Sequence, residues 1–243
     1  MHRHVCEQRD RHGPGHPGAG CGLPERRRPL PHRRRAGGGW LPLDVDSLGV
    51  TALSISGHKL GTPKGIGLLY LRAGTPCEPV LHGGGQERGR RSGTENVAGA
   101  VGLACALGLA QRALPAAATT SRSAQDALVA AVLAAVPGAF VTGHPDTRLP
   151  NLASFCFPGV SGEAVLLELE RRGVICSSGS ACAAGSSEPS AVLLALGIDE
   201  GTAHSAVRLS WTQDTPPTDL AEAARAVIAS VAAVRSLGAA RGA

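Results

Sequence analysis

The sequence has few aromatic residues and almost no lysine. Phe, Trp and Tyr make up 2% of its 243 residues, and Lys59 and Lys64 are its only lysines. No uninterrupted apolar run reaches the ~18 residues of a membrane-spanning helix, and no signal-peptide pattern opens the chain. We therefore expect a cytoplasmic protein, long enough to form one large domain or two small ones.

Paired cysteine motifs are also missing. Seven cysteines make an odd count, and none of them forms a C-x-x-C pair. This pattern argues against a disulfide framework and against a zinc site. We expect reduced thiols and no bound metal at positions 6, 21, 77, 105, 156, 176 and 182.

The excess of positive charge is confined to residues 1–39. This segment holds nine arginines and three acidic residues, whereas the remainder carries a net charge of −1. Arg, His, Pro and Gly dominate it, and it shows no helix or strand periodicity. One interpretation is a disordered basic arm that contacts nucleic-acid phosphates without sequence preference.

The segment Thr51–Tyr70 contains both lysines. Its pattern predicts a buried strand over 51–56, a tight turn carrying Gly57, His58 and Lys59, and a second strand over 66–71. Desolvating an ammonium group is costly, so a lysine just past a buried strand often acts as an amine nucleophile. The alternative is an ordinary surface lysine.

The string S-x-S-G-H-K-L-G-x-P-K-G-I-G-L-L-Y resembles the cofactor-lysine segment of cysteine desulfurases, class V aminotransferase-fold enzymes that use pyridoxal 5'-phosphate. The resemblance implies that Lys59 forms the Schiff base with the cofactor. It also implies that Ser56 and His58 hydrogen-bond the cofactor phosphate. The fold implied is α/β, a partial fold-type I transferase that contains the C-terminal part of the large domain and an α+β small domain.

A one-nucleotide shift in reading frame changes the interpretation of residues 1–39. Under that shift, the degenerate codons of 6–14 permit A-N-N-E-T-G-T-V-Q, and those of 30–38 permit F-H-T-D-A-V-Q-A-A. Both strings resemble family segments that lie directly upstream of the lysine. We hypothesise that 1–39 is out-of-frame translation, 40–114 a remnant of the cofactor-binding large domain, and 115–243 the small C-terminal domain.

The family's upstream segments supply several cofactor contacts. They carry an aspartate for the ring nitrogen, an asparagine and a glutamine for the ring hydroxyl, and a stacking histidine. This chain has none of them at matching positions. An inactive desulfurase fragment is therefore one alternative, because the ring acts as an electron sink when its nitrogen is held protonated.

The string H-G-G-G-Q-E-x-G-x-R-S-G-T ends at Thr94. By itself it predicts a flexible glycine loop. It also resembles the family loop that crosses the dimer interface, which implies that Thr94 reaches the cofactor phosphate of a partner subunit. We expect a helix after it, with Val97, Val101, Leu103 and Leu107 on its apolar face.

The remaining pattern alternates between helices and strands. A turn is predicted over 115–120 and a helix over 123–136. Further on, the pattern predicts strands over 149–157 and 206–211 and helices over 161–172, 189–196 and 218–236. Ser161 is the expected N-cap of its helix.

The string V-I-C-S-S-G-S-A-C-A-A-G places Cys182 in a small polar loop, where a thiol can be exposed. Cys176, Cys105 and Cys156 lie in apolar runs typical of inert thiols. The string resembles the family's catalytic-cysteine segment, which implies a persulfide-forming role for Cys182 and also allows it to act as a transient iron–sulfur ligand. The segment around Arg208 resembles the one that holds the substrate carboxylate.

The resemblance implies conversion of L-cysteine to L-alanine, with sulfur passed through Cys182 to an acceptor protein for iron–sulfur cluster assembly or thio-modification. Lys59, once released, would act as a base. The family also implies a homodimer, without membrane or specific nucleic-acid partners. A selenocysteine lyase or another class V aminotransferase is the other alternative, since such an enzyme does not need Cys182.

Overall fold

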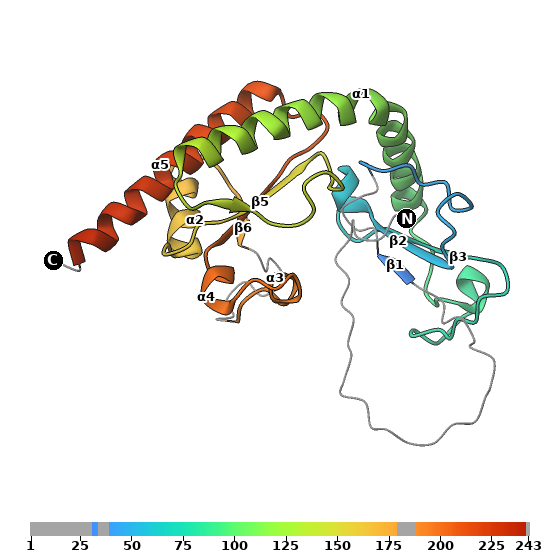
Figure 1. Cartoon of the computed structure of the whole chain (residues 1–243). Coiled ribbons are helices and arrows are strands. Elements are labelled where there is room, and N and C mark those ends of the chain that lie inside the picture. The colour runs from blue at the N-terminus through green and yellow to red at the C-terminus, as the bar shows by residue number, and fades with distance from the viewer. Residues whose placement is uncertain (1–30, 34–38, 179–187, 242–243) are drawn as a thin grey trace, which may run out of the picture. The chain divides into compact units, whose positions relative to one another are not determined.

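The computed structural model describes residues 31–33, 39–178 and 188–241 (Figure 1). Internal contacts divide the chain between Leu114 and Pro115 into two compact units. Most of 1–39 lies outside the described residues, so the frameshift hypothesis remains a prediction.

The first unit contains a three-stranded sheet in the order β1-β2-β3. The strands are β1 (Pro31–Arg33), β2 (Ala52–Ser56) and β3 (Gly67–Leu71). β2 pairs in parallel with β1 and antiparallel with β3. The two strands predicted around the lysine turn are confirmed. The prediction of no strand within 1–39 is wrong, because β1 pairs through backbone groups and needs no side-chain alternation.

β2 is buried on one face only. Leu53 and Ile55 are buried beside Val50, while the residues between them are half-buried. This alternation is the period of two that places successive side chains on opposite faces of a sheet. Tyr70 of β3 and Leu107 pack against the same small cluster. The expected burial therefore holds for one face of β2 and not for both.

Helix α1 (Val97–Ala135) continues through Pro115. A separate turn over 115–120 was predicted because proline lacks the N–H of a helical hydrogen bond; that prediction is wrong. The apolar face was also predicted incorrectly in part, since Leu103 is buried whereas Val97 and Val101 are exposed. By length and composition alone, α1 could cross a membrane. This is weak evidence for a membrane span, because core helices of soluble proteins pass the same test.

The second unit contains a four-stranded antiparallel sheet in the order β4-β5-β7-β6. Its strands are β4 (Phe140–Val141), β5 (Leu152–Cys156), β6 (Ser177–Ser178) and β7 (Ala206–Ser210). Its other helices are α2 (Gly162–Arg171), α3 (Ala191–Ala195), α4 (Glu200–Ala203) and α5 (Pro217–Arg241). The α+β prediction is confirmed. Ser161 caps α2 as expected, by accepting a hydrogen bond from Ala164 N at 3.3 Å.

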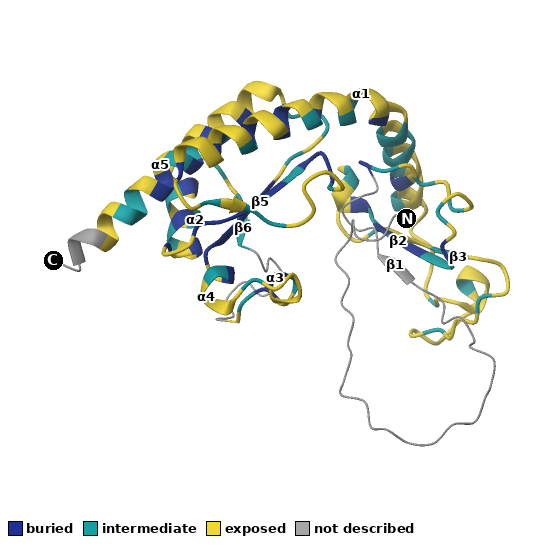
Figure 2. Ribbon diagram, viewed as in Figure 1, coloured by how far each residue is buried: buried dark blue, intermediate teal, exposed yellow. Residues whose placement is uncertain are grey.

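One face of this sheet forms the main core. Phe155 and Val207 are fully buried there against α1, α2 and α5, whose contacting residues include Leu128, Leu169 and Val227 (Figure 2). On the opposite face, α3 and α4 cover Cys156 and Ala206. The sheet is therefore covered by three helices on one side and by two short helices on the other.

A buried polar network joins α1 to the chain entering β5. Gln125 is 1% exposed. Its side-chain nitrogen donates to the carbonyls of Leu149, at 2.8 Å, and Leu152. Nearby, Trp211 Nε1 donates to Ser121 Oγ at 2.7 Å, and that hydroxyl donates to a backbone carbonyl. These bonds satisfy carbonyls that no sheet partner reaches, and an unpaired buried carbonyl is costly.

We expect Gln125→Ala to lower the free energy of unfolding by about 2–4 kcal/mol, because it leaves two carbonyls without a donor and opens a cavity. Urea denaturation measures the change. The control is Ser123→Ala, an exposed position on the same helix, which should stay within ~0.5 kcal/mol of the unsubstituted chain. Equal effects of the two substitutions would contradict the role given to Gln125.

Candidate cofactor and substrate site

A short 3-10 helix, η1 (Gly57–Leu60), follows β2 and carries the predicted lysine. Gly57 is buried, and a Cβ atom there would lie 2.7 Å from Ile66 Cγ2 and 2.9 Å from the Ile66 carbonyl. Real side chains do not tolerate such contacts, so the close packing of η1 on the start of β3 requires glycine. The turn position of Lys59 is thus determined by backbone packing.

Two predicted phosphate ligands meet on this turn. Ser56 Oγ and His58 Nδ1 lie 2.9 Å apart. Lys59 is exposed, because η1 lies at the surface of the described unit. No hydrogen bond or ion pair of Lys59 is found among the described residues. A hydroxyl, an imidazole and an accessible amine within four residues suit a ligand that carries both a phosphate and an aldehyde.

The glycine loop ahead of Thr94 is closed by its own side chains. Gln86, the first residue of η2 (Gln86–Gly89), accepts a hydrogen bond from Gly93 N at 3.1 Å. The next two residues, Glu87 and Arg88, adopt left-handed φ angles of 51° and 58°. Non-glycine residues rarely adopt this conformation, and it persists only where surrounding contacts enforce it. Thr94 follows this closed loop and is exposed.

A row of polar side chains crosses the four-stranded sheet. Ser154 of β5 and Ser177 of β6 are both register partners of Arg208 on β7. Thr142, one residue past β4, continues the row, since its Oγ1 donates to Ser154 Oγ at 2.7 Å. Register partners project from the same face of a sheet. This face is opposite the one that buries Phe155. The sequence pattern indicates Arg208, but it gives no signal for the three hydroxyls beside it.

Arg208 has no partner in this row. It is half-buried, and it makes no hydrogen bond or ion pair with any described residue. The other half-buried arginines in the described segments, such as Arg122 and Arg148, donate to carbonyls or side chains. A partly desolvated guanidinium without an acceptor is costly. Its planar, two-pronged donor geometry suits a carboxylate.

Cys182 lies outside the described residues, which resume at 188. Among the described residues, the second unit has two thiols, buried Cys156 and half-buried Cys176, and burial makes both less reactive. Burial raises the pKa of Cys176 to about 11. Burial also raises the pKa of Cys156. A hydrogen bond with the Ser205 side chain lowers this pKa, but by less than burial raises it. Both are therefore poor nucleophiles near neutral pH. Cys105, expected to be inert and buried, is exposed.

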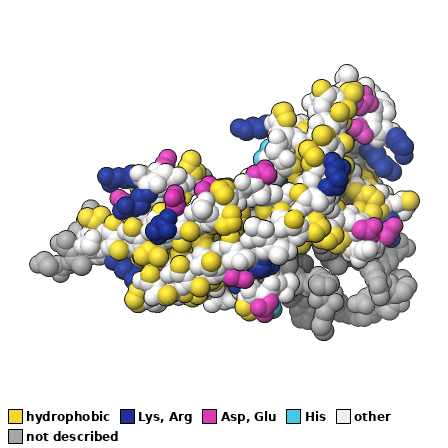
Figure 3. Space-filling model, turned by 90° about the horizontal axis from the view of Figure 1, so that it is seen from above, with side chains coloured by type: hydrophobic (Ala, Val, Ile, Leu, Met, Phe, Trp, Pro, Cys, Tyr) yellow, Lys and Arg dark blue, Asp and Glu magenta, His cyan; other side chains and the backbone are white. Residues whose placement is uncertain are grey.

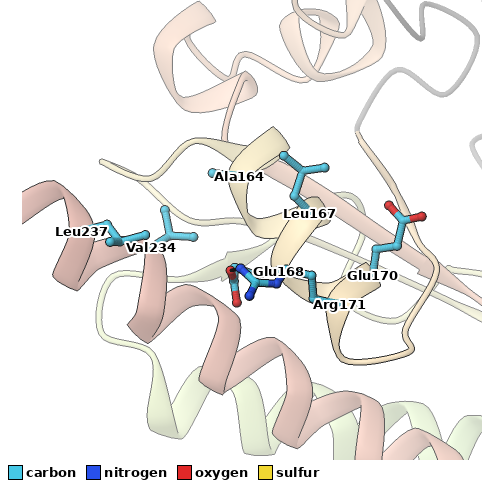
Figure 4. Close-up of a pocket in the computed structure, with 7 residues that line it drawn as sticks. All are labelled: Ala164, Leu167, Glu168, Glu170, Arg171, Val234 and Leu237. Carbon is cyan, nitrogen blue, oxygen red and sulfur yellow. Dashed lines mark hydrogen bonds and ion pairs between the residues drawn. The ribbon is translucent and has the colours of Figure 1, made fainter.

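A hollow between α2 and α5 is a separate feature. Its lining includes Leu167 and Glu170 of α2 and Val234 of α5, and within it Glu168 bonds Arg171 at 3.1 Å (Figure 4). None of the predicted site residues lines it. No group of three or more metal-ligating side chains occurs among the described residues. On the face drawn in Figure 3, Lys and Arg are interspersed with Asp and Glu over the described surface, which does not favour a nucleic-acid interface.

The structure thus groups Ser56, His58 and Lys59 on one turn of the first unit. Thr94 follows the closed loop of that unit, and Arg208 lies in the sheet of the second.

Comparisons with known proteins agree with these motifs. The family model for aminotransferase class-V matches residues 37–221. The chain is 46% identical over 199 residues to the cysteine desulfurase NifS of Azotobacter vinelandii, covering 82% of this chain and 50% of that protein. It is 42% identical over 198 residues to an IscS-like cysteine desulfurase of Mycobacterium tuberculosis, covering 81% and 50%.

A solved structure of a NifS-like protein superposes with a TM-score of 0.70 at 32% identity, covering 82% of this chain and 50% of that one. The chain therefore spans about half the length of the curated relatives it matches. Because the family model covers most of the sequence, the chain belongs to the aminotransferase class-V family, among relatives that are cysteine desulfurases.

Proposed function

We propose that this chain forms part of a pyridoxal phosphate-dependent cysteine desulfurase, which converts L-cysteine to L-alanine and transfers the sulfur through Cys182. The observation that carries the proposal is the pairing of β6 with β7. Ser177, opposite Arg208, lies five residues before Cys182 in the sequence. A carboxylate-binding arginine and a thiol nucleophile are thereby attached to neighbouring strands.

The chain's own residues suit the aldehyde and phosphate groups of the family's cofactor, but the chain has no counterpart of the family's ring contacts. Lys59 would hold the cofactor through Nζ. Ser56 and His58 would hydrogen-bond its phosphate, and Thr94 the phosphate of a partner subunit in a homodimer. When bound, the cofactor supplies an electron sink for bond cleavage at the substrate. Lys59 would also accept and return a proton at Nζ.

Sulfur transfer would use Arg208 and Cys182. Arg208 pairs with the substrate carboxylate and fixes the orientation of the amino acid. The Cys182 thiolate forms a bond to the substrate sulfur as the carbon–sulfur bond breaks. The electron pair of that bond stays with the substrate carbon, which takes up a proton to give alanine. The resulting persulfide on Cys182 would pass to an acceptor protein for iron–sulfur cluster assembly or thio-modification.

The length of chain between β6 and Cys182 allows the thiol to lie near Arg208. Cys182 is four residues after Ser178 in the sequence, which limits their Cα separation to ~14 Å when the chain is fully extended. Ser178 pairs with Val207, next to Arg208. Covalent connection therefore keeps the thiol in the neighbourhood of the arginine whatever conformation the intervening residues adopt.

We expect Lys59→Ala to abolish the absorbance band that pyridoxal phosphate develops on covalent attachment to the chain. The reason is that Lys59 supplies the bonding amine. Titration with the cofactor, followed by borohydride reduction and peptide mass analysis, measures attachment. The matched control is Lys64→Ala, which keeps the band. Attachment that survives loss of Lys59 would eliminate this assignment.

Replacement of Cys182 by serine should leave cofactor attachment unchanged and reduce sulfide release from L-cysteine by at least about 100-fold, because a neutral hydroxyl is a much weaker nucleophile than a thiolate. Sulfide release is measured with dithiothreitol as the acceptor. Selenocysteine lyase or aminotransferase activity does not need this thiol. Undiminished release from L-cysteine would therefore favour that class instead.

Alkylation rates test the contrast among the cysteines. A pKa of about 11 at Cys176, against the ordinary 9.0, leaves about 100-fold less thiolate at pH 8. We expect iodoacetamide to label Cys176 at least that much more slowly than exposed Cys77, and its rate to rise about tenfold per pH unit up to pH 10. Quantitative peptide mass spectrometry gives both rates, and equal labelling at pH 8 would contradict the burial of Cys176.

A further inference from the structure

The three hydroxyl groups in the row beside Arg208 differ in the acceptors of their hydrogen bonds. Thr142 Oγ1 donates to Ser154 Oγ at 2.7 Å. Ser177 Oγ donates to the carbonyl of Ser178 at 3.2 Å. The proton of Ser154 has no acceptor among the described residues. A hydroxyl has one proton to donate and two lone pairs to accept, so Ser154 accepts from Thr142 and keeps its own proton available.

Ser154 and Arg208 lie directly opposite each other on neighbouring strands. Such pairs have Cβ atoms about 4.5–5.5 Å apart, close enough for both side chains to contact one small ligand. Both residues are half-buried, where charge-assisted hydrogen bonds are stronger than in open water. The row therefore presents two kinds of unused donor, one guanidinium and one oriented hydroxyl, and no acidic side chain.

We propose that Ser154 is a second carboxylate-binding residue, whose hydroxyl donates to the carboxylate that pairs with Arg208 and is oriented for this by Thr142. The proposal rests on the proposed function for the identity of the ligand, an α-amino acid. It adds a residue that fixes the rotation of the carboxylate, since a second donor on another strand determines which oxygen faces the guanidinium.

Thr142 is a positioning residue, which acts on the carboxylate only through Ser154. Its hydroxyl occupies a lone pair of Ser154 Oγ, and its backbone N–H donates to the Ser154 carbonyl at 2.8 Å. This pair of contacts holds the end of β4 against β5. Removing the Thr142 hydroxyl leaves the Ser154 hydroxyl free to rotate, and weakens the carboxylate contact without deleting it.

The test is an NMR titration of the chain without cofactor, with L-alanine as the probe. The Nε–Hε signal of Arg208 is followed in arginine-labelled protein and assigned by its loss in Arg208→Lys. We expect Ser154→Ala to raise the dissociation constant about tenfold, the effect of one hydrogen bond to a charged group. Thr142→Val should raise it by about two- to threefold.

The matched control is Ser210→Ala. Ser210 lies two residues along β7 on the same face and pairs with Leu152, so its loss should leave the affinity unchanged. Ethylamine, which is L-alanine without its carboxylate, should not shift the Arg208 signal in any variant. The spectra themselves show whether each variant is folded.

Three results would overturn the proposal: no response of Arg208 to L-alanine, an unchanged affinity in Ser154→Ala, or equal losses in Ser154→Ala and Ser210→Ala. Because the titration omits the cofactor, failure of Lys59 to bond pyridoxal phosphate leaves it unaffected, and the two ideas fail separately. In cofactor-loaded protein, Ser154→Ala should raise the KM for L-cysteine with kcat unchanged; a fall in kcat at constant KM would contradict a carboxylate contact.

Discussion

The register between β5 and β7 is the constraint on which the second unit depends. It assigns Ala153, Phe155 and their partners on β7 to the core, and it assigns Ser154 and Arg208 to the other face. A shift of one residue would place the guanidinium in the core and expose the aromatic ring, which is why one buried face specifies register strongly. Hydrophobic burial on one side of the sheet therefore positions the polar row on the other. A second pairing, of β6 with β7, places Ser177 beside Arg208, and Cys182 follows five residues later in the sequence.

The first unit positions its amine by a different constraint. There the lysine turn depends on close backbone approach, because Gly57 packs on Ile66 with no room for a Cβ atom. The side chains that matter are short-range neighbours, so Ser56 and His58 meet through local sequence rather than through strand pairing. A site assembled from local contacts can form with a small supporting core, whereas the Arg208 row requires four strands to be paired.

This difference explains what the sequence could predict. The lysine turn, the strands that flank it, the cap at Ser161 and the strand of Arg208 all follow from local pattern, and each was predicted. A turn was expected over 115–120 because proline cannot donate a helical hydrogen bond, but α1 continues through Pro115. The hydroxyl row was not predicted, because Thr142, Ser154 and Ser177 come from three separate segments and only register brings them together. Small residues such as these carry no signal of their own in the sequence.

In the proposed sulfur transfer, the sheet and the thiol would have different tasks. The substrate carboxylate would keep one orientation through the reaction, and adjacent paired strands hold donors to within a fraction of an ångström. The thiol would instead receive sulfur at the substrate and deliver it to an acceptor. The groups proposed for these tasks lie at different places along the chain: Arg208, which has no hydrogen-bond or ion-pair partner among the described residues, lies in the middle of β7, and Cys182 follows β6 in the sequence. Cys156 and Cys176 lie where burial raises the pKa of each thiol and suppresses its thiolate, so neither would compete with Cys182 in the proposed transfer.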